Sequence, residues 1–166
     1  MERRIYYRFS DNVRRHIAYE EAYSIYLKIK SEHDERVARV ELEKKKQQVD
    51  FWRALSGREF EIELGKLYER MGYIVTHTPH TSDGGVDLLV EKGGKLTAIQ
   101  CKAHNKRISI GVIRELCTSM NDFRAAEAII ACFDGVTRPV HEYIKDRPII
   151  VLDVSAIVEL QREYSN

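Results

Sequence analysis

The sequence predicts an α/β domain, with a mixed central sheet flanked by helices, that follows a long N-terminal helical extension. Three observations support this prediction. All nine glycines and all three prolines follow Ser56, so residues 1–56 contain no strong helix breaker. Two apolar runs on either side of Gly93-Gly94 predict a β-hairpin. Beyond the hairpin, helical and apolar stretches alternate, which is typical of a sheet covered by helices on both faces.

The extension, residues 1–56, is predicted to be helical almost throughout. Ser10 is a suitable cap for a helix that begins at Asp11 and runs to Leu55, either unbroken or with a joint near Ser31. A stripe of residues at spacings of three and four along this helix fits dimerisation or partner docking, and it equally fits an amphipathic helix folded back on the domain. Spacings of three and four along the helix connect Ala22, Tyr26, Ile29, His33, Val37, Val40, Lys44, Gln47 and Phe51.

Residues 57–166 form the predicted domain, in the order helix, three strands, helix, strand, helix, strand, helix. The final helix is expected to be capped by Asp153. Because an antiparallel beginning is followed by alternating helices and strands, we expect a mixed sheet. The expected helices cover about 58–71, 110–123, 136–145 and 155–164, and the expected strands cover about 73–79, 84–90, 96–102, 128–133 and 148–152.

The glycine turn predicts the register of the hairpin. With Gly93-Gly94 as the loop, Leu88 lies opposite Ile99 and Asp87 lies opposite Gln100. Asp87 and Gln100 then share a face at about 5 Å, with Lys102 one diagonal step further at about 7 to 8 Å from Asp87. The other residues are apolar on both faces, which is typical of central strands. One face is expected to carry Val86, Leu88, Val90, Ile99 and Cys101, and the other Leu89 and Ala98.

The polar residues at the end of this apolar strand pair require an explanation. A carboxylate, an amide and an ammonium group lose solvation worth several kcal/mol there unless they hold each other, a metal or a ligand. One interpretation is a structural salt bridge between Asp87 and Lys102. The other is a metal-dependent phosphodiesterase site, in which Asp87 and the Cys101 carbonyl bind Mg²⁺ and Lys102 steadies the attacking water or the phosphate charge. Spacing alone does not choose between them.

The motif Gly85-Val86-Asp87, followed after twelve residues by Gln100-Cys101-Lys102, resembles the PD-(D/E)xK nuclease superfamily. The variant with glutamine, and with cysteine before the lysine, resembles the catalytic domain of the Mrr family of restriction endonucleases. The resemblance covers residues 60–160 and implies a restriction-endonuclease-like fold and a Mg²⁺-dependent DNA endonuclease of restriction or defence type. Further matching motifs are Phe60-Glu61, Gly72-Tyr73, Asp83-Gly84 and Val112-Ile113-Arg114-Glu115.

The resemblance also implies a role for each site residue. Asp87, Glu61 and the Cys101 carbonyl would hold Mg²⁺. Mn²⁺ is expected to substitute for Mg²⁺. Gln100 would position a metal-bound water or act as a weaker metal ligand, and Lys102 would orient or deprotonate the attacking water. Because an amide replaces a carboxylate at Gln100, we expect weaker metal binding than in the acidic variant and a larger role for Glu61. Periodicity alone leaves Glu61 as a solvated helix carboxylate.

DNA contacts are expected from local basic clusters, because the formal net charge is only +1. The turn His104-Asn105-Lys106-Arg107 follows the active-site strand, so Lys106 and Arg107 are placed to hold the phosphate backbone and His104 to face DNA. A solvated loop is the alternative interpretation of this basic run. Arg114, on the next helix, is expected to reach the site.

Two other functions remain open from the sequence: a Holliday-junction or branched-DNA resolvase, and a catalytically inactive nucleic-acid-binding or assembly module. The expected partners are DNA and either a second copy of the chain or a protein bound by the N-terminal helix. The three cysteines have no C-x-x-C spacing and indicate buried thiols in a reducing cytoplasm. We expect no membrane span and no secretory signal, because no apolar run reaches about 18 residues.

Overall fold

The computed structural model describes residues 2–79 and 85–165, and for residues 2–15 and 17 it describes the backbone alone. The chain forms two compact units, Met1–Glu43 and Lys44–Asn166. Residues 44–56, which we assigned to the extension, therefore belong to the second unit. Asp83 and Gly84 of the predicted motif lie outside the described residues.

Helix α1 spans Glu2–Lys46, so it begins before Ser10 and ends before Leu55. The helical structure is interrupted at Gln48, whose backbone is extended, and it resumes in the short helix α2, Val49–Arg53. Trp52 explains this break, because its indole is fully buried and donates a hydrogen bond from Nε1 to the Lys46 carbonyl at 2.8 Å. The joint thus lies at the end of α1 and not near Ser31.

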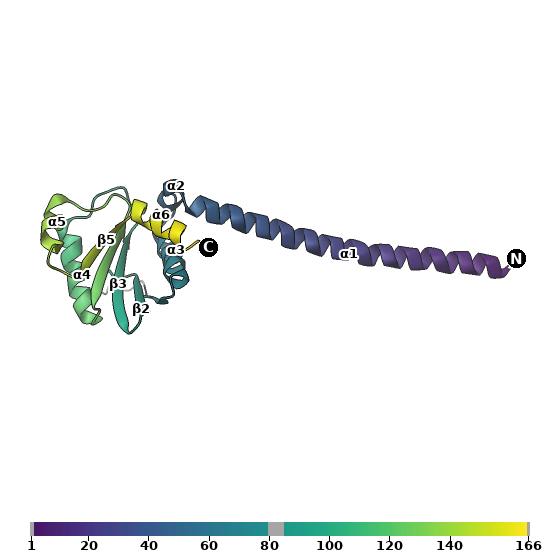
Figure 1. Ribbon diagram of the computed structural model, residues 1–166, viewed down its shortest axis with the longest axis horizontal. Helices are drawn as coiled ribbons and strands as arrows, with labels where there is room; N and C mark the ends of the chain where they lie inside the picture. Colours follow the sequence, from purple (N-terminus) through teal and green to yellow (C-terminus); the bar gives the residue numbers. More distant parts are fainter. Residues whose placement is uncertain (1, 80–84, 166) are drawn as a thin grey trace. The chain divides into compact units, whose positions relative to one another are not determined.

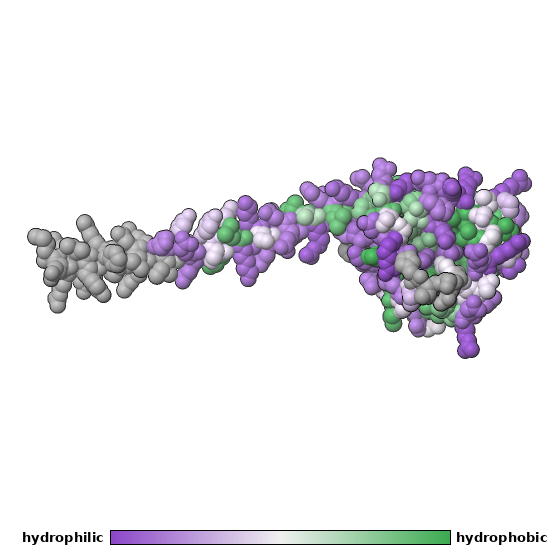
Figure 2. Space-filling model, turned by 180° about the vertical axis from the view of Figure 1, so that it is seen from behind, coloured by the Kyte–Doolittle hydropathy of each residue, from purple (hydrophilic) through white to green (hydrophobic). Residues whose placement is uncertain are grey.

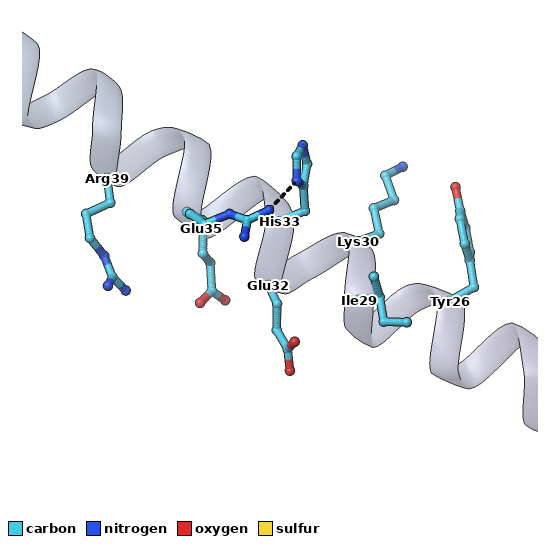
Figure 3. Close-up of a pocket in the computed structure, with 8 residues that line it drawn as sticks. Tyr26, Ile29, Lys30, Glu32, His33, Glu35 and Arg39 are labelled. Carbon is cyan, nitrogen blue, oxygen red and sulfur yellow. Dashed lines mark hydrogen bonds between the residues drawn. The ribbon is translucent and has the colours of Figure 1, made fainter.

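The described part of the first unit lies entirely within α1, and large apolar side chains are exposed along it between charged ones (Figure 2). Tyr26 is 56% exposed, Ile29 60% and Val40 50%. Figure 3 shows side chains around a shallow hollow pointing to opposite sides of α1, so one helix does not enclose a ligand there. The hollow is lined by Tyr26, Ile29, Lys30, Glu32, His33, Glu35, Arg36 and Arg39. Neither α1 nor any other described helix has the length and apolar character that crossing a membrane requires.

The second unit contains a five-stranded mixed sheet in the order β1-β2-β3-β4-β5. The pairs β1–β2 and β2–β3 are antiparallel, and β3–β4 and β4–β5 are parallel, as the sequence predicted. The strands are β1 Ile74–His77, β2 Leu88–Lys92, β3 Lys95–Lys102, β4 Glu127–Cys132 and β5 Ile149–Asp153. The remaining helices are α3 Gly57–Arg70, α4 Ile110–Asp122, α5 Arg138–Ile144 and α6 Val154–Glu163.

Helices cover both faces of the sheet, with α3 and α6 on one side and α4 and α5 on the other (Figure 1). The first layer packs Phe60 of α3 and Ile157 of α6 against Ile99 of β3. The second layer packs Ile113 of α4 against Ala98 of β3. Strand β3 is therefore buried from both sides, which confirms the prediction of a central strand.

The hairpin has the predicted register at its turn and departs from it at its other end. Gly93 and Gly94 have φ angles of 61° and 77°, and Leu88 pairs with Ile99. The prediction that Val86 shares a face with Leu88 is wrong, because Val86 belongs to the layer of α4 and α5. The chain leaves the regular ladder before Leu88, so strict alternation does not extend back to Val86.

Candidate active site

Asp87 lies where the β2–β3 ladder ends. Its backbone N–H donates to the Ile99 carbonyl at 2.8 Å, and its carboxylate Oδ2 accepts the backbone N–H of Cys101 at 2.7 Å. The carboxylate thus takes the place of a backbone acceptor. The predicted pairing of Asp87 directly opposite Gln100 is not part of the ladder, which stops at Leu88. This charge-assisted hydrogen bond holds the Asp87 carboxylate against β3.

Glu61 is positioned by the first turns of α3. A capping box fixes the start of this helix, since the Ser56 hydroxyl accepts from the Glu59 N–H and the Glu59 carboxylate accepts from the Ser56 N–H at 2.8 Å. Glu61 is only 6% exposed, and its Oε2 accepts from Arg58 Nη1 at 2.8 Å. Glu61 is therefore a buried, paired carboxylate and not the solvated one that periodicity allowed.

Three charged groups act on the thiol of Cys101. Burial raises the pKa of this thiol well above its ordinary value. The carboxylates of Asp87 and Glu61 raise the same pKa further, whereas the Lys102 ammonium lowers it. The carboxylate on α3, the carboxylate just before β2 and the ammonium at the end of β3 therefore all lie close enough to change the pKa of one buried thiol.

Gln100 carries a buried amide oxygen that has no hydrogen-bond partner among the described residues. The residue is 1% exposed, and a Cβ on Gly85 would lie 2.2 Å from its Nε2. Gly85 has a φ of 75° and leaves room for the amide. An unpartnered buried acceptor costs about 1 to 3 kcal/mol, so this oxygen is available to a water, a cation or a ligand.

The predicted DNA-contacting residues fall into two places. His104, Lys106 and Arg107 are exposed in the loop that follows β3, and the His104 N–H donates to the Lys102 carbonyl at 3.0 Å. Arg114 is exposed on α4, where its guanidinium lies 5.9 Å from the centre of the Tyr143 ring. The structure thus brings the first three next to Lys102 and places Arg114 against α5.

Arg53 of α2 is a residue of this region that the sequence did not indicate. Its Nη1 donates to Asn105 Oδ1 at 2.7 Å, and its Nη2 donates to Asp134 Oδ1 at 2.5 Å. The partners lie 52 and 81 residues away along the chain, so no local pattern reveals them.

The donors around Cys101 are suited to a hard cation. Within residues 2–79 and 85–165, no group of three His, Cys, Asp or Glu side chains is arranged to bind a metal. The side-chain oxygens present are instead of mixed kinds: the carboxylates of Asp87 and Glu61, each with a hydrogen bond, and the amide oxygen of Gln100, which has no partner among the described residues. Carboxylate, carbonyl and water oxygens are the ligands that Mg²⁺ prefers, so the residues present fit this ion.

Comparison with known proteins identifies the domain. The Mrr_cat family model, described as restriction endonuclease, matches residues 52–161. The DNA modification-dependent restriction endonuclease AspBHI is similar in structure, with a TM-score of 0.51 and 18% identity over 64% of this chain and 31% of that one. Can2 from Sulfobacillus thermosulfidooxidans, solved with cyclic tetra-adenylate, has a TM-score of 0.51 and 17% identity over 66% and 36%.

A third similar structure is AF1548, a protein of unknown function, with a TM-score of 0.51 and 14% identity over 60% of this chain and 63% of that one. At these identities the structural likeness shows a shared restriction-endonuclease-like fold. The match spans less than two thirds of each of the three solved chains. No curated protein matches the chain significantly.

Proposed function

The chain belongs to the Mrr family of restriction endonucleases, and from this premise we propose that it is a Mg²⁺-dependent nuclease that hydrolyses phosphodiester bonds in DNA. The observation that carries the proposal is the Asp87 carboxylate held by the Cys101 N–H at 2.7 Å, on the strand that ends at Lys102 and carries the buried Gln100 oxygen, which has no partner among the described residues. A structural salt bridge between Asp87 and Lys102 does not explain the buried amide oxygen.

In the proposed site, Asp87, Glu61 and the Cys101 carbonyl would hold the ion, and Gln100 would position a water through its amide oxygen. Bound Mg²⁺ would supply charge neutralisation at the phosphate and a lower pKa for the attacking water. Asp87 is already held by the Cys101 N–H, so little ordering is needed when the site fills.

As an ammonium, Lys102 orients the attacking water or stabilises charge that develops on the phosphate, and as the neutral amine it accepts the proton of the water. Its place at the last residue of β3 puts it next to Cys101, the residue that the two carboxylates also approach. The amide of Gln100 brings one negative charge fewer than a carboxylate does. We therefore propose weaker metal binding than in the acidic variant and a stronger dependence on Glu61.

The proposed substrate is DNA, in a restriction or defence role. The exposed side chains of His104, Lys106 and Arg107 follow the active-site strand directly and are proposed to hold the phosphate backbone. Arg114 is proposed as a more distant phosphate contact, since it is exposed on α4. AspBHI is described as DNA modification-dependent, so methylated DNA is the first modified substrate to test.

Cleavage assays test the proposal. Plasmid, methylated and branched DNA would be incubated with the protein and Mg²⁺ or Mn²⁺, and we expect cleavage that EDTA abolishes. Asp87→Asn and Lys102→Ala should remove the activity, whereas Asp122→Asn, an exposed carboxylate at the end of α4, should not. Unaltered cleavage by both site variants would remove these residues from the mechanism.

The same assays separate the alternatives. A strong preference for branched over linear DNA would replace the restriction-type activity by a resolvase activity. Mn²⁺ titration of the wild type and of Asp87→Asn addresses the inactive module. Binding that depends on Asp87 supports an active site, and no such binding together with no cleavage indicates a module that only binds nucleic acid or assembles.

We further propose that α1 forms a homodimer or docks a partner through its exposed apolar stripe. Ile29 and Val40 lie on that stripe and are 60% and 50% exposed. For the homodimer, solution mass should be that of two chains, and Ile29→Glu combined with Val40→Glu should halve it. A wild-type monomer would leave partner docking as the proposed role.

A cytoplasmic location completes the proposal. Cys101, Cys117 and Cys132 are all free thiols, and two of them are buried. Free thiols persist in a reducing compartment. Fractionation of cells that express the full-length protein would test this location.

A further inference from the structure

One arginine of α2 joins the loop after β3 to the loop after β4. Arg53 donates from Nη1 to Asn105 in the first loop and from Nη2 to Asp134 in the second, at 2.7 and 2.5 Å. The side chains of Arg53 and Asp134 are 34% and 31% exposed, so this contact is half-buried. The planar guanidinium has donors spread in a fixed fork, which suits it to hold two acceptors at once.

Arg53 is itself held in place from the core. The neighbouring Trp52 is fully buried, donates to the Lys46 carbonyl and packs edge-on against Phe60 with ring centres 6.0 Å apart. The Arg53 guanidinium also lies 5.7 Å from the centre of the Phe133 ring. α2 thus supplies a fixed point from which Arg53 reaches the loops.

The loop after β3 carries the cations that the proposed function assigns to the DNA backbone. His104, Lys106 and Arg107 are exposed there. The backbone is tied near each end of this loop, by the His104 N–H on the Lys102 carbonyl and by the Ile108 N–H on the Gly135 carbonyl, both at 3.0 Å. The bond from Arg53 to Asn105 falls between these ties. Because ordering a loop on binding costs conformational entropy, a restraint present before binding strengthens the interaction.

We propose that Arg53 is a positioning residue that holds this loop in the conformation in which Lys106 and Arg107 contact DNA phosphates. The inference rests on the proposed function, because it assigns the loop to DNA. Arg53 acts through Asn105, since Asp134 neutralises its charge. The hold on the loop and its value for DNA binding are separate quantities, so they can be measured separately.

Limited trypsin digestion measures how strongly Arg53 restrains the loop after β3, and it does not require nuclease activity. Trypsin cleaves after lysine and arginine, so Lys106 and Arg107 report on the loop itself. In Arg53→Ala and in Asn105→Ala, we expect cleavage after these residues to be about fivefold faster than in the wild type. Arg162→Ala is the matched control, because Arg162 also donates a hydrogen bond to a residue far away in the chain, at the Gln47 carbonyl, but does not contact the loop in any described bond.

Conservative variants separate loss of the Arg53–Asn105 hydrogen bond from general unfolding. Asn105→Asp keeps an acceptor for Arg53 and should be cleaved no faster than the wild type. Arg53→Lys replaces the fork with a single ammonium and should lie between the wild type and Arg53→Ala. Asn105 is exposed in a loop, so Asn105→Ala should fold even where Arg53→Ala does not.

Binding of a fluorescent duplex oligonucleotide, measured by anisotropy in EDTA, tests whether the restraint of the loop increases the affinity for DNA. Asn105→Ala leaves the net charge unchanged, yet we expect its Kd to rise about threefold to tenfold. Its dependence on salt should stay like that of the wild type, whereas Lys106→Ala should have a smaller salt slope because a phosphate contact is lost.

The outcomes distinguish this inference from the proposed function. Faster loop cleavage with weaker DNA binding supports it. Unchanged loop cleavage in Asn105→Ala contradicts the proposal that Arg53 restrains the loop through Asn105, and it leaves the nuclease proposal unaffected. Faster loop cleavage with an unchanged Kd overturns the positioning role. If the wild-type protein binds no DNA, the proposed function and the role assigned to the loop are both contradicted. This holds even if digestion shows that Arg53 restrains the loop through Asn105.

Discussion

The two ends of the β2–β3 hairpin are built in opposite ways. At the turn end, the ladder is regular up to Lys92 and Lys95, and the buried hydroxyl of Thr97 donates to Glu127 at 3.0 Å. At the open end, the ladder stops, a carboxylate replaces a backbone acceptor and the oxygen of Gln100 has no partner in the described chain.

This difference separates stability from function within one structural element. The turn end satisfies its polar groups internally, which is the usual condition of a folded protein. The open end leaves one buried oxygen, that of Gln100, without a partner among the described residues, and such local conflicts are expected at functional sites. Substitutions at the turn end should therefore change stability, and those at the open end should chiefly change activity.

The largest expected effect compares the two lysines that end β3. Lys102→Ala should lower the cleavage rate by about 10² to 10³-fold, because it removes the cation proposed to stabilise charge at the phosphate. Lys95→Ala, at the other end of the same strand, should leave the rate within about twofold, since its pairing with Glu127 is structural. Single-turnover cleavage rates measure both. Equal loss of activity in the two variants would contradict the comparison.

The second comparison uses two glycines with similar positive φ angles. Gly85 and Gly94 have φ of 75° and 77°, but a Cβ at Gly94 meets nothing within 4 Å, whereas one at Gly85 meets Gln100 at 2.2 Å. Gly94→Ala should cost about 1 to 2 kcal/mol of unfolding free energy from backbone strain alone. Gly85→Ala should cost about 1 to 2 kcal/mol more, because an extra group is forced into a packed site.

Urea denaturation would give both free energies, and cleavage rates should fall only for Gly85→Ala. The double variant Gly85→Ala, Gln100→Ala is its control, since removing the amide relieves the contact and leaves the strain. If the single and double variants are equally unstable, the contact with Gln100 is not the cause.

The third comparison should reverse the sign of a stability change. Gln100→Leu removes the unpartnered oxygen and keeps a similar volume, so we expect the metal-free protein to become about 1 kcal/mol more stable while cleavage weakens. Thr97→Val breaks a satisfied hydrogen bond and should destabilise by about 1 kcal/mol. Thermal unfolding in EDTA measures both. Destabilisation by Gln100→Leu would indicate that water or another group already satisfies this oxygen.

The smallest expected effect is a pH dependence at the turn end. The hydrogen bond from Lys95 lowers the pKa of Glu127 below its ordinary value of 4.5, and that from Thr97 lowers it further against the opposing effect of burial. A lowered folded-state pKa gives stability that is present above pH 4.5 and lost as the pH falls through the folded value.

Glu127→Gln should therefore be less stable than the wild type at pH 7, by up to about 0.5 kcal/mol for such a partly exposed pair. The difference should shrink as the pH falls from 4.5 to 3. Urea denaturation at these pH values would detect it, and a difference that stays constant across the range would contradict the assignment.

The parts of the fold that were predictable are those with local causes. The Gly93-Gly94 turn set the register of the hairpin, and Asp153 accepts from the Ala156 N–H as a cap, at 2.9 Å. Alternation failed at Val86, because a departure from the ladder moves a side chain to the other face. The end of α1 was missed because the burial of Trp52 decides it.

The candidate site divides in the same way. Its residue types were visible in the motif that ends at Lys102, whereas the burial of Glu61, its pairing with Arg58 and the missing partner of Gln100 were not. Residue types follow from the order of the chain. A pairing or a missing partner depends on every neighbouring side chain, and no spacing in the sequence encodes that sum.

The amino-acid order by itself determined the sequence of helices and strands after residue 56, the register at the glycine turn and the set of residues that can hold a cation, because turns, caps and periodicity act over a few residues. The tertiary structure decided which of those residues meet around Cys101 and that Arg53 reaches two loops. These contacts join residues that are far apart in the chain, so they depend on how the helices and loops pack around the sheet and not on local sequence.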